Sequence, residues 1–215
     1  MQKREFLKGS LAALGVFGCG AAAAKSEFPE AKDIKWDETF DVVVVGSGIA
    51  ATCAANESLD LGAKRVIMVD KMPVFGGNSA INGGAFAVAG SPLQEKEGIK
   101  DSPERMLQDM IRSGRGLSHV DLLKMIVEGT RPAFDFTLEH GVQYKPFVQH
   151  FGGHSVPRIM QTVESTGGGI TRPLADSCRK HGVDMHLNAK MESFIRDADG
   201  RVIGLKAVSY THLTL

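Results

Sequence analysis

Apolar positions in the first half of the chain fall into short continuous runs separated by stretches of small residues. Residues 40–45 form a continuous, mostly β-branched run, the pattern of a central parallel strand that is buried on both faces. Small residues at helical spacing predict a helix over 49–61 that ends at Gly62, and the run 65–70 predicts the next strand. These segments make one βαβ unit, which indicates an α/β fold with a parallel central sheet.

The middle of the chain has the periodicity of helices. Ser102 and Pro103 are the residue types of an N-cap and a first helical position, so we expect a helix from there to about Ser113. The polar run 94–105 is interpreted as a solvated face. Three methionines at core spacing are expected to pack in the interior: Met106, Met110 and Met125.

Two further helices are expected before residue 141. One begins after Ser118, and the next runs from Pro132 to His140 and stops at Gly141. The apolar stripe of the first of these is formed by Leu122, Leu123, Ile126 and Val127. We expect all these helices to pack on the sheet. His119 and His140 lie at helix ends, where we expect a helix-dipole or capping role and no part in catalysis.

The last third of the chain predicts a helix followed by strands. The helix follows the glycines at 167–169, continues through Arg179 and ends at Gly182. Residues 183–208 predict a strand and then a β-hairpin that turns at Asp199 and Gly200. The whole pattern is therefore a parallel sheet with a helical insertion and a β-hairpin.

Charge and cysteine content exclude several classes of function. Lysine plus arginine and aspartate plus glutamate number 25 each, so no net field attracts nucleic acid or an anionic membrane. Cys19, Cys53 and Cys178 form neither a C-x-x-C pair for zinc nor a C-x-x-C-H site for haem. We therefore predict no nucleic-acid partner, no metal site and no disulfide scaffold.

The first 24 residues predict an export signal. Lys3 and Arg4 make a basic start resembling a twin-arginine signal, and the apolar run 11–24 is too short to span a membrane. Cys19 leaves a lipoprotein site as the alternative to a small apolar residue, and a frayed N-terminal helix is the alternative for the whole segment. We expect a linker over 25–38, one domain over 39–215, and a periplasmic location. The location is cytoplasmic if the signal interpretation fails.

Glycines lie where the first predicted strand meets the helix. Gly46 permits a tight turn, Gly48 lets a pyrophosphate approach the backbone, and Ala51 lets the helix pack close to the strand. Asp70 ends the second strand, 22 positions after Gly48, where a carboxylate accepts hydrogen bonds from ribose hydroxyls. A strand before, a helix after and an acid at this distance favour a Rossmann-like dinucleotide site over a chance glycine turn.

The next stretch indicates which dinucleotide is bound. Residues 71–88 carry two Gly-Gly pairs flanking Asn78 and Ser79, and related glycine-rich signatures stand at 151–158 and 165–170. These segments resemble the soluble fumarate reductase and flavocytochrome c flavoprotein family, in which such a loop holds FAD. The resemblance covers about residues 37–208.

Carried over to this sequence, the resemblance implies a set of FAD contacts. At the pyrophosphate it implies Gly46, Ser47, Gly48 and Ala50, and near the adenosine Asp70 and Lys71, with Met191 in a segment that passes the adenine. Along the diphosphate and flavin it implies Gly77, Asn78, Ser79, Gly83 and Gly84. The polar pair His154 and Arg158 has two readings, a contact to the flavin or an anionic substrate, and a structural loop closed by hydrogen bonds.

The resemblance also implies an activity. Members of the family transfer hydride from flavin N5 to the C=C bond of an unsaturated carboxylate such as fumarate, under a capping domain whose motifs do not occur here. We therefore expect an N-terminal part of a longer enzyme, with its catalytic residues beyond residue 215. A separate cytochrome or quinol-linked donor is expected because the sequence contains no haem motif. The alternatives are a urocanate- or methacrylate-type reductase, an aspartate oxidase, a ketosteroid dehydrogenase, and a flavin-binding or electron-relay module without chemistry of its own.

Overall fold

The predicted βαβ unit is present. The computed structural model describes residues 34–209 of the 215 in the chain, so the predicted export signal and most of the linker lie outside the described residues. Strands β1 (Val42–Val45) and β2 (Val66–Val69) pair in parallel, and α1 (Ile49–Asp60) connects them. Strand β5 (Asp184–His186) pairs in parallel with β2, which gives the sheet order β1-β2-β5.

The expected burial of the first strand on both faces is wrong. Val44 is 8% exposed, but its neighbours Val43 and Val45 are 41% and 46% exposed. Val44 packs in a core cluster with Ala55 of α1 and with Cys178, so helices cover only this face of the sheet. Because alternate residues of a strand point to opposite faces, the two flanking valines are left exposed within the described part of the chain.

The covered face carries α1, which packs on β1 and β2, and α6 (Gly168–Lys180), which packs on α1. The buried amide of Asn56 on α1 donates to the carbonyl of Leu174 on α6 at 3.0 Å. As predicted, α6 is followed by Gly182 in the left-handed region, at φ +87°. The short helix α2 (Gly77–Ala80) contacts α6 on the side of the glycine-rich loops.

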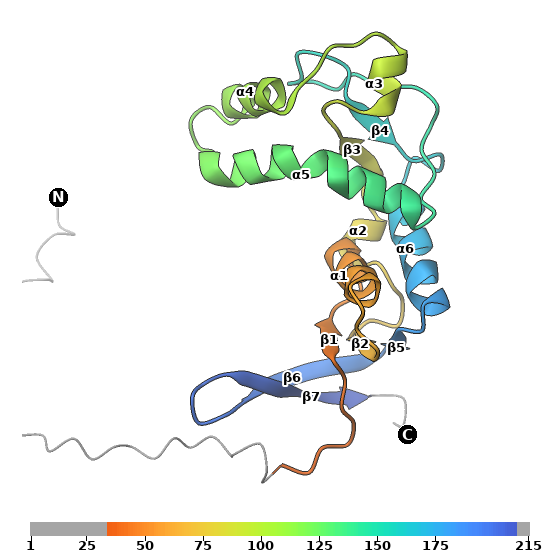
Figure 1. The fold of residues 1–215 in the computed structure, drawn as a ribbon, viewed down its shortest axis with the longest axis vertical. Coiled ribbons are helices and arrows are strands. Elements are labelled where there is room, and N and C mark those ends of the chain that lie inside the picture. The colour runs from red at the N-terminus through yellow and green to blue at the C-terminus, as the bar shows by residue number, and fades with distance from the viewer. Residues whose placement is uncertain (1–33, 210–215) are drawn as a thin grey trace, which may run out of the picture.

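A second group of elements surrounds a two-stranded antiparallel sheet. Strand β3 (Ala85–Ala87) pairs with β4 (Ile159–Gln161), and helices α3 (Pro92–Lys96), α4 (Pro103–Ser113) and α5 (Val120–Glu139) lie beside it (Figure 1). The side chains Val88, Phe134 and Met160 form the core between α5 and these strands. The inserted helices therefore pack on this sheet, and the expectation that they cover the parallel sheet is wrong.

The start of α4 is as predicted, but the next two predicted helices are one. The Ser102 hydroxyl caps α4 by accepting the Arg105 N–H at 3.2 Å. Helix α5 is continuous through Pro132, which removes one backbone donor. It continues because Phe134 and Thr137 on the following turns are buried, and tertiary packing outweighs the local cost of the proline.

The predicted burial of apolar side chains on α5 is only partly correct. Val127 is buried, whereas Leu122, Met125 and Ile126 are 53%, 63% and 46% exposed. Met106 of α4 is buried as predicted. His119 and His140 are the N-cap and C-cap residues of α5, so their predicted positions at helix ends are confirmed. The His119 side chain makes no capping hydrogen bond, and His140 Nδ1 lies 2.8 Å from the Ser177 hydroxyl, so the structure does not show a side-chain capping role.

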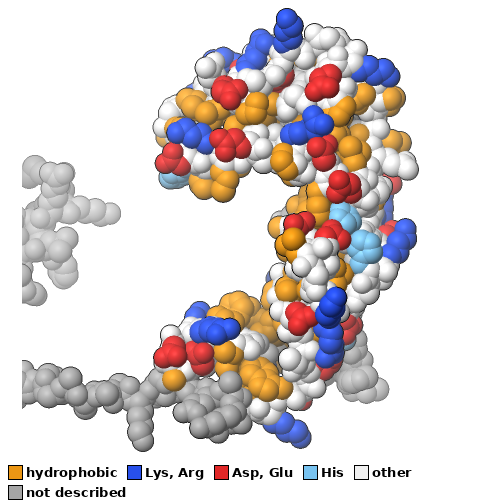
Figure 2. All heavy atoms as spheres, in the orientation of Figure 1, with side chains coloured by type: hydrophobic (Ala, Val, Ile, Leu, Met, Phe, Trp, Pro, Cys, Tyr) orange, Lys and Arg blue, Asp and Glu red, His pale blue; other side chains and the backbone are white. Residues whose placement is uncertain are grey.

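The described part of the chain ends in the predicted β-hairpin. Strands β6 (Ala189–Arg196) and β7 (Val202–Ser209) pair in antiparallel fashion, and Gly200 has φ +80° in the turn between them. A side chain at Gly204 of β7 would overlap the ring of Trp36, which packs on the hairpin. Figure 2 shows that the molecule is hollowed on one side between α5 and this hairpin.

Candidate FAD-binding site

The turn between β1 and α1 presents backbone donors to open space. Gly46 has φ +100°, and its N–H donates to the Val69 carbonyl at 2.8 Å, which anchors the turn to β2. Within residues 34–209, the N–H groups of Ser47, Gly48 and Ala50 donate to no protein acceptor. A Cβ added at Gly46 would meet no atom within 4 Å. Unpaired donors at the positive end of a helix beside open space fit a diphosphate.

Asp70 lies at the end of β2 with both carboxylate oxygens already oriented. The Ser47 hydroxyl donates to one oxygen at 2.5 Å, and the Met72 N–H donates to the other at 2.8 Å. A carboxylate offers about four acceptor positions, so about two remain for a ligand. This geometry fits the predicted role of Asp70 toward ribose hydroxyls.

The loop that leads into α2 closes against the phosphate turn. Gly76 has φ +103°, and its N–H is directed at both the carbonyl and the hydroxyl oxygen of Ser47, at 3.1 and 3.2 Å. The Ser79 hydroxyl accepts the Ile49 N–H, the first of α1, at 3.2 Å. Asn78 is exposed beside it. The fold therefore brings the two glycine-rich loops together, although about 30 residues separate them in the sequence.

The second Gly-Gly pair has two different environments. Gly83 is exposed, and a Cβ there would meet no atom within 4 Å. Gly84 is buried at φ +63°, where a Cβ would overlap the Thr166 carbonyl, and its N–H donates to the Asn82 side chain at 2.7 Å. The direction of a side chain is therefore open to a ligand at Gly83, whereas at Gly84 the protein itself fills it.

The glycines at 167–169 lie where the start of α6 packs against the loop of residues 79–82 and against Thr162. A Cβ at Gly167 would overlap the Ser79 carbonyl, and one at Gly169 would lie 2.8 Å from the Thr162 side chain. The Gly167 N–H donates to the Asn82 carbonyl at 2.8 Å. This glycine cluster therefore allows α6 to approach the α2 loop, a packing role that its composition alone did not distinguish from ligand binding.

The other predicted adenosine contacts surround Asp70. The Asp70 carbonyl accepts the Ala189 N–H at 2.8 Å, and the Met72 carbonyl accepts the Asn188 N–H at 3.1 Å, so the start of β6 lies beside the end of β2. Met191 is half-buried two residues further along β6, and Lys71 is exposed.

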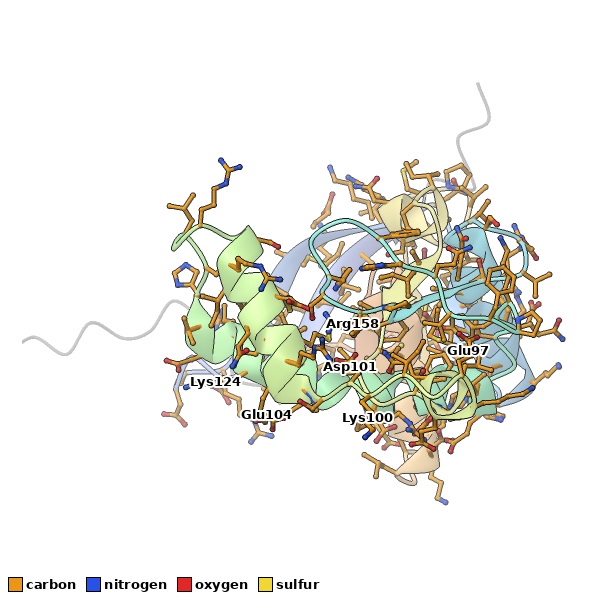
Figure 3. All side chains as sticks on the ribbon, turned by 90° about the horizontal axis from the view of Figure 1, so that it is seen from above. Glu97, Lys100, Asp101, Glu104, Lys124 and Arg158 are labelled. Atoms are coloured by element: carbon orange, nitrogen blue, oxygen red, sulfur yellow. The ribbon has the colours of Figure 1, made fainter. Side chains whose placement is uncertain are left out.

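Arg158 and His154 lie outside this group of loops. The Arg158 side chain is fully buried and forms ion pairs with Asp101 at 2.9 Å and Asp109 at 2.7 Å. Figure 3 shows Arg158 and Asp101 next to one another beside α4. His154 Nδ1 lies 2.9 Å from Arg158 Nη1. Of the two readings of this pair, the geometry favours the structural loop.

The buried carboxylates of this network were not predicted. Asp101 falls within the polar run that we interpreted as a solvated face, yet its side chain is fully buried, as is that of Gln94, which donates to it at 2.9 Å. That interpretation is wrong for these two residues. Their polar neighbours in the sequence carry no signal of burial, because the partner, Arg158, is more than 50 residues away.

Two pockets in the described part of the chain are lined by residues outside the glycine loops. An apolar pocket of about 430 Å³ is lined by Ile49 and Cys53 of α1 together with Phe86 and Phe136. A larger pocket of about 830 Å³ lies among the C-terminal ends of α1, α5 and α6. We place the cofactor at the phosphate turn, because that is where unpaired backbone donors and a positioned carboxylate converge.

A parallel βαβ unit with an open glycine turn and an acid at the end of the second strand defines a dinucleotide-binding protein of the α/β class. A family model described as "FAD binding domain" matches residues 41–211, and the chain belongs to this family. The cofactor is therefore FAD, and the predicted family and fold class are confirmed.

Curated relatives include several reductases. The chain is 46% identical over 204 residues to the acrylate reductase flavoprotein subunit of Shewanella woodyi. The aligned residues make up 95% of this chain and 40% of that protein. It is 36% identical to the urocanate reductase of Eggerthella lenta, over 79% of this chain and 28% of the relative. The chain thus spans less than half the length of these relatives.

Solved structures show the same fold. A flavocytochrome c3 fumarate reductase in its open conformation superimposes with a TM-score of 0.74 at 27% identity, over 83% of this chain and 34% of that one. A 3-ketosteroid-Δ4-(5α)-dehydrogenase from Rhodococcus jostii superimposes with a TM-score of 0.72 at 25% identity, over 85% and 45%. Among the described residues, no helix is both long and apolar enough to cross a membrane.

Proposed function

We propose that this chain is the FAD-binding part of a reductase that acts on the C=C bond of an α,β-unsaturated carboxylate. The observation that carries the proposal is the open phosphate turn with Asp70 positioned beside it. The similarity to an acrylate reductase flavoprotein subunit over 95% of the chain supports a small unsaturated carboxylate as substrate. Relatives named urocanate reductase and fumarate reductase (cytochrome) support the same bond type with different substituents.

In this proposal the residues of the chain bind and orient the cofactor. The N–H groups of Ser47, Gly48 and Ala50 hold the diphosphate, and Asp70 accepts hydrogen bonds from the adenosine ribose. We propose as the other FAD contacts Gly46, Lys71, Gly77, Asn78, Ser79, Gly83, Gly84 and Met191. When bound, reduced FAD supplies a hydride from N5. We assign no residue of this chain to proton donation or to the substrate carboxylate.

The electron donor is proposed to be a separate protein. These 215 residues contain no C-x-x-C-H motif, and a relative from Shewanella frigidimarina that is 33% identical is named fumarate reductase (cytochrome). We therefore propose a separate cytochrome or a quinol-linked donor. The proposed periplasmic location rests on the twin-arginine-like start of the sequence, and cell fractionation tests it.

The test uses the full-length protein from its native host, purified without added flavin. Bound FAD gives an absorbance band at about 450 nm. Oxidation of reduced methyl viologen is then followed with acrylate, fumarate, crotonate and urocanate as acceptors. We expect turnover with at least one of them, and fastest turnover with acrylate.

The results separate the proposal from its main alternative. Protein that binds FAD but reoxidises the viologen with none of the four acids would be a flavin-binding or electron-relay module, and the reductase proposal would be wrong. Colourless protein that stays colourless after reconstitution with FAD would contradict the cofactor as well. Turnover with only one acid identifies the substrate class directly.

A further inference from the structure

One buried hydroxyl connects three segments of the FAD site. Ser47 is 1% exposed and lies in the turn after β1. Its Oγ donates to Asp70 at the end of β2 at 2.5 Å and lies 3.2 Å from the N–H of Gly76, which begins α2. Both contacts are made by residues more than 20 positions away, so the hydroxyl joins parts of the site that only the fold brings together.

The hydroxyl also determines how the Asp70 carboxylate is oriented. The Ser47 hydroxyl holds Oδ2 and the Met72 N–H holds Oδ1, so one donor acts on each oxygen. A carboxylate held at both oxygens cannot rotate without losing a hydrogen bond. Hydrogen bonds to a charged acceptor are stronger than bonds between neutral groups, and the Ser47 bond has the short length of that class.

The same hydroxyl also holds the loop that leads into α2. The Gly76 N–H is shared between the carbonyl and the hydroxyl oxygens of Ser47. Gly76 is buried at φ +103°, and a Cβ there would lie 2.7 Å from Ala80. The loop that carries Asn78 and Ser79 thus depends on Ser47 for the position of its first residue.

We propose that Ser47 is a positioning residue for FAD, acting through Asp70 and Gly76. Its hydroxyl orients the carboxylate so that the two remaining acceptor positions face the 2′ and 3′ hydroxyls of the adenosine ribose. Because Asp70 and Gly76 already engage its hydroxyl, Ser47 would offer the diphosphate only its backbone N–H. This inference rests on the FAD site of the proposed function.

The orientation of Asp70 also defines the class of ligand that is accepted. Both free positions accept hydrogen bonds and carry negative charge, so they suit a ribose diol and repel a 2′-phosphate. The ligand is a dinucleotide or nucleoside diphosphate with a free 2′-hydroxyl. Loss of the Ser47 hydroxyl should weaken both FAD and ADP, because both carry the adenosine ribose. FAD should be weakened at least as much as ADP, because Gly76 also positions the loop that carries Asn78 and Ser79.

The test measures binding of FAD and of ADP to the full chain after removal of its flavin, by isothermal titration calorimetry. For Ser47→Ala we expect both dissociation constants to rise roughly 10- to 100-fold. Ser47→Cys fills the position with a somewhat larger side chain that donates only weakly, so it should behave like the alanine variant and remains informative if that variant fails to fold. Ser58→Ala is the matched control, because the Ser58 hydroxyl bonds only within α1, to the Ala54 carbonyl at 2.6 Å.

A second measurement separates positioning from a general structural role. In an Asp70→Asn background, Ser47→Ala should weaken ADP far less than it does in the wild type, because the carboxylate that it orients is gone. Equal effects in both backgrounds would overturn the proposal, and so would binding of FAD to Ser47→Ala and Ser47→Cys within twofold of the wild type. If the wild type itself binds no FAD, the proposed function fails, which is a distinct result.

Discussion

Arg158 binds Asp101 through two parallel hydrogen bonds, from Nε to Oδ2 and from Nη2 to Oδ1, each 2.9 Å long. Neither side chain is exposed to solvent. The remaining nitrogen of the guanidinium, Nη1, donates to Asp109 on α4 at 2.7 Å. One arginine therefore fastens the loop before β4 both to α4 and to the segment that precedes α4.

Replacing Arg158 with methionine should strongly destabilise the fold. Two buried carboxylates would lose their counter-ion, and breaking a buried ion pair in this way costs about 3–5 kcal/mol. Urea unfolding of the apo chain measures the effect. Arg179→Met is the control, since Arg179 pairs with Asp176 on the surface and should change the free energy of unfolding by less than about 1 kcal/mol. Equal effects of the two substitutions would contradict the structural role of Arg158.

The same carboxylates should make the protein sensitive to acid. Burial tends to raise the pKa of Asp109, but hydrogen bonds from Ser155 and the Arg158 guanidinium outweigh it and hold the pKa well below 3.8. The pKa of Asp101 is lowered in the same way, against burial, by Arg158 and Gln94.

A carboxyl whose folded pKa is depressed contributes stability above its unfolded pKa and loses it as pH falls through the folded value. We therefore expect the free energy of unfolding to decline as pH drops below about 4. In Asp109→Asn this decline should be shallower, although the variant is less stable at pH 7. An unchanged slope would show that Asp109 is not responsible.

His154 should remain neutral at pH 7. Burial lowers its pKa below 6.5, and the nearby positive charge of Arg158 lowers it further. Titration of the imidazole signal by NMR, assigned by its loss in His154→Asn, should give a pKa below 6.5. A pKa at or above 6.5 would mean that the ring is more solvated, or closer to the acids, than the structure shows.

Substitution of the neighbours Gly83 and Gly84 by alanine should change the stability of the fold to very different degrees. Gly84→Ala combines a positive φ with overlap on the Thr166 carbonyl, so it should cost at least about 2 kcal/mol of stability. Gly83→Ala projects into open space and should change stability by less than about 0.5 kcal/mol. If the flavin occupies that space, Gly83→Ala should still weaken FAD binding. Comparison of thermal unfolding with FAD titration separates these two effects.

Cys178 should be inert in the folded protein. Burial, with a contribution from the nearby Cys53, raises the pKa of its thiol to about 11. At pH 8 only about one thousandth of the thiol is ionised, and the thiolate is the reactive form. Peptide mapping after iodoacetamide treatment should find Cys178 labelled only when denaturant is present. Labelling in the native state at the rate of the half-buried Cys53 would contradict this prediction.

Local chemistry in the sequence determined the elements of the cofactor site. The signals of the site lie within about 30 residues of one another: a β-branched run, glycines at a turn and an acid at the end of the next strand. Each of them specifies a backbone conformation or a charge at one place in the sequence. For that reason the βαβ unit, the cap at Ser102 and the turn at Gly200 were predictable. The similarity to known flavoproteins then identified FAD as the cofactor.

Burial and partnership were decided only by the tertiary structure. Val43 and Val44 are alike in the sequence, but only Val44 faces α1 and α6, and Pro132 does not end α5 because the turns after it are buried. The sequence around Asp101 predicts a surface acid, but in the fold Asp101 is buried against Arg158, which is 57 residues away. Likewise, Ser47 and Asp70 form a unit only because parallel pairing aligns the ends of β1 and β2. Which side chains meet depends on long-range packing, whose partners no local pattern specifies.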